Sequence, residues 1–81
     1  MTAMVDVVVP SLGEDVSTVT LVAWVVEPGG PCVEGEPLFE VETDKAVFEV
    51  EAEVTGTLTE VLADAGAAVS PGAVVGRIRA A

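Results

Sequence analysis

The sequence predicts an all-β fold, a flattened β-barrel or sandwich of antiparallel strands. Valine, threonine and other β-favouring residues recur in short runs that glycines and prolines interrupt. Long helical periodicity is absent from the chain. In addition, two parts of the chain repeat at an offset of 37 residues. Two related half-sheets that close on each other would give this pattern.

Six main strands are expected, separated by turn signals at residues 10–15, 28–31 and 70–72. They cover residues 4–9, 17–26, 36–43, 46–52, 56–63 and 73–79. Short extra strands are expected at residues 32–33 and 68–69. The best helix candidate is residues 60–68, and Gly66 and the neighbouring valines argue against it.

The repeat aligns equivalent positions of the two halves. The aligned pairs are Leu21 with Leu58, Trp24 with Val61, Gly29 with Gly66, Cys32 with Val69, Gly35 with Gly72, and Val41 with Ile78. Two copies are too few for a solenoid, so we expect a pseudo-two-fold axis instead. The alignment places Cys32 at an apolar position, which favours a buried side chain over a reactive thiol. Extra residues in the first copy, at positions 12–16, predict a loop that protrudes more than its mate.

Length and composition restrict the functional classes. The 81 residues allow a single domain spanning residues 1–81, too small for an enzyme with its own cofactor cleft. Fourteen acidic and three basic residues give a formal net charge of −11, which argues against nucleic acid and anionic membranes as partners. There is no histidine, and the single cysteine supplies neither an internal disulfide nor a thiolate zinc site. The carboxylates lack calcium-loop spacing, so no metal site is expected.

No segment that directs the chain to or through a membrane is expected. The N-terminal stretch has no basic region, and Asp6 interrupts its apolar run, so it does not resemble a signal peptide. No stretch approaches the roughly 18 apolar residues that a membrane span requires.

The segment around residues 39–50 predicts a β-hairpin with a two-residue loop at Asp44 and Lys45. In that register apolar residues face apolar residues and acids point to water. The expected pairs are Thr43 with Ala46, Val41 with Phe48, Glu40 with Glu49, and Phe39 with Val50. Asp-Lys is a poor sequence for such a turn, because these turns favour residues with positive φ. A broken local rule often marks a functional site.

Lys45, the only lysine in the chain, is therefore expected at the tip of a hairpin. Nine acidic residues lie between positions 27 and 53 around it. Two interpretations follow from position and count alone. The lysine either relieves acidic repulsion on the surface or is displayed for another protein to find.

The sequence around this lysine resembles the modification hairpin of lipoyl domains. Glu-Gly-Glu-Pro-Leu-Phe-Glu-Val-Glu-Thr-Asp-Lys-Ala at residues 34–46 carries the likeness. Val-Pro-Ser-Leu-Gly-Glu at residues 9–14 and Trp-Val-Val-Glu-Pro-Gly at residues 24–29 resemble the first strand and a Trp-Leu-x-x-x-Gly stretch of that family. Lipoyl domains are carrier domains of the acyltransferase (E2) component of 2-oxo acid dehydrogenase complexes. One departure is Val19, where the family usually has glycine; its repeat mate Gly56 keeps one.

The resemblance implies a barrel-sandwich hybrid of two four-stranded antiparallel sheets with quasi-two-fold symmetry. It also implies that lipoic acid is attached as an amide to Lys45, with Asp44 and Ala46 read as flanking recognition residues. The implied partners are the decarboxylase (E1), the acyltransferase catalytic core, dihydrolipoyl dehydrogenase (E3) and a lipoylating enzyme. A non-catalytic, monomeric carrier is then expected, in the bacterial cytoplasm or, in a eukaryote, the mitochondrial matrix.

Two alternatives stay open. A biotin carboxyl carrier-type domain shares the fold and the hairpin lysine, but that family sets the lysine between methionines, and the only methionines here are Met1 and Met4. An unmodified interaction module would leave Lys45 incidental. The 2-oxo acid that the complex uses is not fixed by the sequence.

Overall fold

The computed structural model describes residues 3–13 and 17–81. These residues form eight strands: β1 (Met4–Val8), β2 (Val19–Trp24), β3 (Pro31–Cys32), β4 (Pro37–Glu42), β5 (Val47–Glu51), β6 (Gly56–Val61), β7 (Ala68–Val69) and β8 (Val74–Ala80). Each predicted strand is present, including the two short ones. Within the same residues the structure shows no helix able to cross a membrane.

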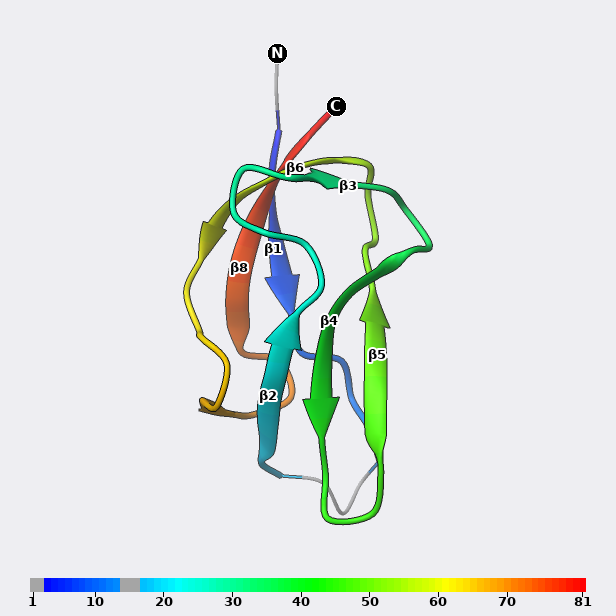
Figure 1. Cartoon of the computed structure of the whole chain (residues 1–81), viewed down its shortest axis with the longest axis vertical. Helices are drawn as coiled ribbons and strands as arrows, with labels where there is room; N and C mark the ends of the chain where they lie inside the picture. The colour runs from blue at the N-terminus through cyan, green and yellow to red at the C-terminus, as the bar shows by residue number, and fades with distance from the viewer. Residues whose placement is uncertain (1–2, 14–16) are drawn as a thin grey trace.

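The strands form two four-stranded antiparallel sheets that face each other (Figure 1). One sheet has the order β1-β8-β6-β3 and the other the order β5-β4-β2-β7. Consecutive strands lie in different sheets, except β4 and β5, which form a hairpin within one sheet, and the connections between the sheets give a flattened barrel. The predicted fold class is confirmed.

The core lies between the two sheets and takes side chains from both of them. Leu21, Phe39 and Val41 enter it from one sheet, and Leu58 and Ile78 enter it from the other, all with at most 1% of their surface exposed. These residues come from the apolar positions of alternating strands, since one face of each sheet is buried and the other is solvated. No polar or charged residue is buried among the residues described.

The quasi-two-fold symmetry is visible in the hydrogen bonds. The Leu21 N–H donates to the Ala67 carbonyl at 2.9 Å, and 37 residues later the Leu58 N–H donates to Gly30 at 3.0 Å. The mates Gly29 and Gly66 both have positive φ, at 87° and 92°. Gly35 and Gly72 likewise share φ values of 87° and 89°. The repeat therefore reflects one backbone path that the chain uses twice.

The predicted strand ends differ from the observed ones by at most two residues, and the end of β2 has an identifiable reason. The strand expected at residues 17–26 ends at Trp24, because Val25 and Val26 both direct their N–H groups at the Leu38 carbonyl, at 2.9 and 3.4 Å, and so leave the regular ladder. Residues 60–68, against whose helix formation Gly66 and the valines argued, contain the end of β6, a turn and the first residue of β7, and no helix. Of the loop expected to protrude at residues 12–16, positions 14–16 lie outside the described residues.

The departure at Val19 is accommodated. Val19 has 2% of its surface exposed and packs in the core. A Cβ at its repeat mate Gly56 would overlap the Arg79 carbonyl oxygen, so glycine is required there by close approach of the backbones.

Candidate functional site

The hairpin of β4 and β5 has the predicted register. Val41 pairs with Phe48, Glu40 with Glu49, and Phe39 with Val50, and the Thr43 N–H donates to the Ala46 carbonyl at 2.8 Å. The chain reverses at Asp44 and Lys45. The alternation of apolar and acidic residues was therefore sufficient to place the lysine at the turn.

The turn is closed by a side chain that the sequence analysis did not identify as important. The Thr43 hydroxyl oxygen accepts the N–H groups of both Lys45 and Ala46, each at 3.2 Å. It also lies 3.3 Å from the Ala46 carbonyl, to which it can donate. No described residue other than glycine has a positive φ, so the Asp-Lys turn needs no left-handed residue. A threonine directly before a tight turn is the signal that could have indicated this arrangement.

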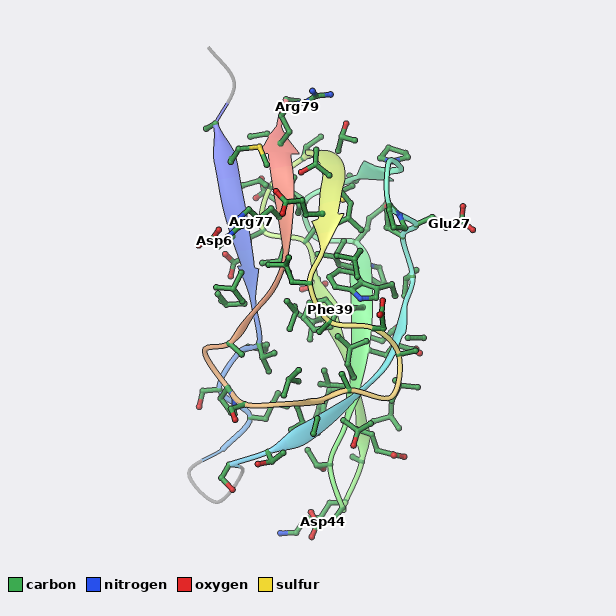
Figure 2. All side chains as sticks on the ribbon, turned by 90° about the vertical axis from the view of Figure 1, so that its left-hand side faces the viewer. Asp6, Glu27, Phe39, Asp44, Arg77 and Arg79 are labelled. Carbon is green, nitrogen blue, oxygen red and sulfur yellow. The ribbon has the colours of Figure 1, made fainter. Side chains whose placement is uncertain are left out.

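The lysine at this turn is exposed, as are Asp44 and Ala46 on either side of it. Figure 2 shows Asp44 at the extreme tip of the hairpin. Among the described residues, both ion pairs involve Arg77 and neither involves Lys45. No ion pair with a described residue therefore holds the ammonium group against the body of the domain, and the neighbouring Ala46 has a small side chain.

The base of the hairpin packs in the core of the domain. Phe39 and Val41 of β4 are fully buried, and the ring of Phe39 lies against Trp24 with centroids 5.0 Å apart. The Trp24 indole N–H in turn donates to the Ala63 carbonyl at 2.8 Å, which ties the two halves of the fold together. A rigid base below an exposed tip keeps the tip in a defined place.

The position of the tip in the whole molecule is also distinctive. The molecule measures 39 × 20 × 20 Å, and the hairpin turn lies at one end of the long axis (Figure 1). The start of β1 and the end of β8 lie together at the opposite end, where the Ala80 N–H donates to the Ala3 carbonyl at 2.9 Å. Anything attached to Lys45 therefore projects away from the chain ends.

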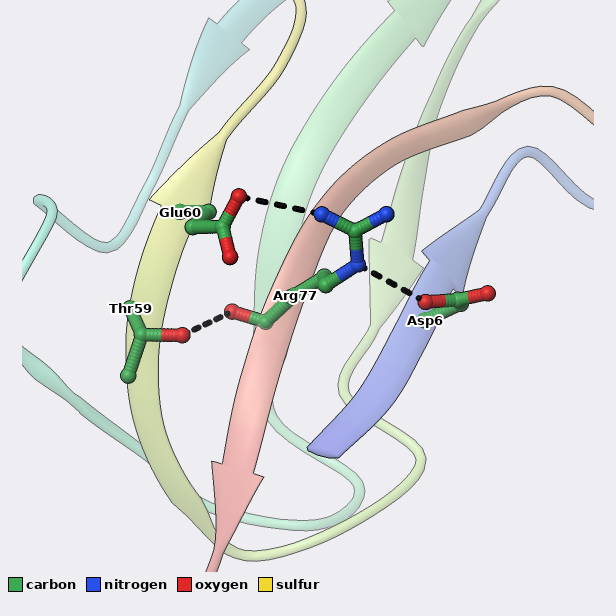
Figure 3. A network of polar contacts seen from close by, with 4 residues as sticks. All are labelled: Asp6, Thr59, Glu60 and Arg77. Carbon is green, nitrogen blue, oxygen red and sulfur yellow. Dashed lines mark hydrogen bonds and ion pairs between the residues drawn. The ribbon is translucent and has the colours of Figure 1, made fainter. Parts of the chain in front are cut away.

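Charge is distributed differently on the two sheets. On the β1-β8-β6 side, Arg77 bridges Asp6 at 3.1 Å and Glu60 at 3.0 Å, and its carbonyl accepts the Thr59 hydroxyl at 3.2 Å (Figure 3). On the hairpin, Glu40 faces Glu49 directly, with no such bridge between them. Like charges opposite each other destabilise a strand pair. The hairpin is thus acidic, and no ion pair offsets the repulsion between Glu40 and Glu49.

The other side chains that could take part in chemistry offer neither a reactive thiol nor a metal site. Cys32 has 1% of its surface exposed, as the repeat predicted, and burial raises the pKa of its thiol, an effect that a hydrogen bond with the Leu58 backbone partly opposes. A buried thiol with a raised pKa is a poor nucleophile. Across residues 3–13 and 17–81 there is no cluster of three or more potential metal ligands.

Comparison with known proteins places these features in context. The family model described as "Biotin-requiring enzyme" (Biotin_lipoyl) matches residues 5–78. The dihydrolipoyllysine-residue succinyltransferase component of the 2-oxoglutarate dehydrogenase complex of Escherichia coli K12 is 44% identical over 93% of this chain and 18% of its own length. The dihydrolipoyllysine-residue acetyltransferase component of the pyruvate dehydrogenase complex of Corynebacterium glutamicum is 43% identical over 94% of this chain and 11% of its own length. The chain thus spans less than a fifth of these relatives.

A solved structure gives the same result. The lipoyl domain of the 2-oxoglutarate dehydrogenase complex from Azotobacter vinelandii superposes with a TM-score of 0.74 and 31% sequence identity. The match covers 91% of this chain and 94% of that domain. The similarity therefore extends over a complete domain of that protein.

Proposed function

Because this chain belongs to the biotin- and lipoyl-attachment family, and within it to the lipoyl domains, we propose that Lys45 is the residue to which lipoic acid is attached. The observation that carries the proposal is the exposed lysine, in neither ion pair of the described residues, at the tip of a hairpin whose base is buried. It is also the only lysine in the chain, so no second amine of this kind competes for the attachment.

The residues at the tip fit a covalently attached lipoyl group. The Nζ of Lys45 supplies the nucleophile for an amide, and its exposure lets a modifying enzyme reach it without opening the fold. Amide formation removes one positive charge and changes the formal net charge from −11 to −12, since two arginines then stand against fourteen acids. When bound, lipoic acid supplies a disulfide-containing ring that can accept an acyl group and two electrons.

The chain's own contribution is to position and display that group. The Thr43 hydroxyl holds the turn, and the buried base fixes its direction. The long lysine stem leaves the attached group free to visit several active sites. Tethering raises the local concentration of a carried group at each site that it can reach. On this account the domain itself performs no catalysis.

The relatives suggest where such a carrier works. We place the domain in a 2-oxo acid dehydrogenase complex, where it would receive acyl groups at the decarboxylase, deliver them at the acyltransferase core and be reoxidised by dihydrolipoyl dehydrogenase. The relatives reported above are bacterial, and we place this domain in the bacterial cytoplasm accordingly. The start of β1 and the end of β8 lie at the opposite end of the 39 Å long axis from the tip (Figure 1). Attachment through that end would leave the hairpin free.

Lipoic acid, and not biotin, is the group we assign. Asp44 and Ala46 flank the lysine, and we propose that the modifying enzyme reads them together with the shape of the turn. The relatives whose names specify dihydrolipoyllysine support this choice.

Incubation of the purified domain with a lipoate–protein ligase, lipoate and ATP tests the assignment, with a parallel reaction containing a biotin–protein ligase and biotin. We expect one lipoyl group per chain, mapped by peptide mass spectrometry to Lys45, and no biotinylation. Lys45→Arg, which keeps the charge, should accept neither group. Lipoylation of the Lys45→Arg variant, or preferential biotinylation of the wild-type chain, would contradict the proposal.

A further inference from the structure

A small apolar groove opens where the two sheets meet at one side of the domain, away from the hairpin tip. Its volume is about 60 Å³. The floor and walls are mainly aliphatic, formed by Val5, Val7, Leu38, Val50, Val54 and Ile78. This volume is far below the roughly 300 Å³ of the smaller small-molecule sites and suits a single aliphatic side chain. None of the residues that line the groove lies between Thr43 and Phe48, so it is separate from the attachment site.

The groove lies between two strands that have open edges. β1 is the last strand of one sheet and β5 is the last strand of the other, and each pairs with a neighbour on one side only. An open edge presents unpaired N–H and C=O groups that an added extended segment can use. The groove therefore provides a pocket for a side chain beside backbone groups suited to bind an extended chain.

The rim of the groove is acidic. Three carboxylates line it, and Asp6 is already paired with Arg77 at 3.1 Å. Glu51 and Glu53 are exposed, and neither takes part in an ion pair within the described part of the chain. Their Cα atoms are at most about 7 Å apart, because only two residue steps separate them. Lysines that flank one residue in an extended segment are about 7 Å apart, which is comparable.

We propose that this groove docks an extended segment of a partner protein in which one aliphatic residue is flanked on both sides by basic residues. In an extended chain successive side chains point in opposite directions. The aliphatic side chain would enter the groove, and its two basic neighbours would turn outward to Glu51 and Glu53. Charge complementarity selects this occupant, since the two exposed carboxylates attract basic neighbours and repel acidic ones, and a purely apolar segment gains nothing from them.

The test uses two capped peptides and nitrogen-15 NMR of the whole domain. The probe is acetyl-Thr-Lys-Val-Lys-Thr-amide, and the control acetyl-Thr-Lys-Ser-Lys-Thr-amide has the same charge without the aliphatic anchor. We expect the first peptide to shift the amide signals of residues 5–8 and 50–54, and the second to bind at least 5-fold more weakly. Failure of the probe to shift those signals at millimolar concentration would overturn the proposal, as would equal binding of both peptides.

Domain variants separate specific docking from general attraction to an acidic protein. Glu51→Gln with Glu53→Gln should weaken binding of the probe by about 5-fold, the size expected for two exposed ion pairs. The matched control, Glu27→Gln with Asp64→Asn, also removes two negative charges. These residues lie in the loops after β2 and β6 and do not line the groove. Figure 2 shows Glu27 on the opposite side of the domain from Asp6. An equal loss in both double variants would refute the assignment of the groove.

This inference is independent of lipoylation. The peptide test uses the unmodified domain, so its failure leaves the attachment at Lys45 standing. Conversely, a Lys45→Arg domain should bind the probe as the wild type does.

Discussion

The hydroxyl of Thr43 is predicted to hold the turn at Asp44 and Lys45 in place, and Thr43→Val tests this directly. The substitution keeps the β-branched shape and removes only the hydrogen-bonding atom. In the structure that atom accepts two backbone N–H groups at 3.2 Å, near the long end of the normal range. Because the turn is exposed, each bond contributes at the low end of the usual 0.5–1.5 kcal/mol, or about 1 kcal/mol together.

A loss of about 1 kcal/mol in the local opening free energy corresponds to roughly 5-fold faster exchange of the amide that loses its partner. We therefore expect the Lys45 and Ala46 amides to exchange about 5-fold faster with solvent in Thr43→Val, measured by NMR. The rate of lipoylation should fall as the turn becomes less well defined. Global stability should change little, because the core below the turn is intact.

Thr43→Ser is the matched variant, since it restores the hydroxyl without the methyl group. It should return both the amide exchange and the lipoylation rate towards the wild-type values. Unchanged exchange at Ala46 in Thr43→Val would show that the hydroxyl does not hold the turn. A fall in lipoylation with Thr43→Ser but not with Thr43→Val would indicate that the enzyme reads the methyl group instead.

Four further substitutions test the fold around the site. Gly56→Ala should lower the free energy of unfolding by about 3 kcal/mol in a denaturant titration, because its Cβ would overlap the Arg79 carbonyl. Gly66 has open space around it but a φ of 92°, so Gly66→Ala should lower the free energy of unfolding by only about 1 kcal/mol. Arg77→Met removes two exposed ion pairs and should lower the free energy of unfolding by at most about 1 kcal/mol. This difference should shrink in 1 M salt, and a loss that does not depend on salt would show that packing dominates. Burial raises the pKa of the Cys32 thiol, because the folded state disfavours the thiolate. The stability that this thiol contributes to the folded state is therefore complete below the pKa of the unfolded thiol. It is lost as the pH rises through the pKa of the folded state. Denaturation curves from pH 7 to 10.5 should therefore show wild-type stability falling relative to Cys32→Val, and parallel curves would contradict this reasoning.

The fold was predictable because its determinants are short-range and repeated. Alternation of apolar and acidic residues set the register of the hairpin, since a slip of one residue would reverse every side chain. The offset of 37 residues predicted two equivalent halves, and the shared positive φ of Gly29 and Gly66 shows why glycine recurs at that offset. The burial of Cys32 followed from its alignment with Val69.

Other features depended on contacts that the sequence pattern does not contain. The role of Thr43 was missed because the turn was judged by the φ preferences of Asp44 and Lys45, whereas a side-chain oxygen supplies the acceptor. The early end of β2 depends on the Leu38 carbonyl, which is distant in sequence. The groove arises where the edges of two sheets fail to pair, and no local pattern of residues specifies such a place.

The claim at the centre of this account is that Lys45 carries a lipoyl amide. The most direct test is the mass of the proteolytic peptide containing Lys45, taken from the protein purified from its native host. The account predicts a lysine heavier by one lipoyl group, less the water lost in forming the amide. A peptide whose lysine is unmodified in cells that lipoylate other proteins, or whose lysine carries biotin, would contradict it.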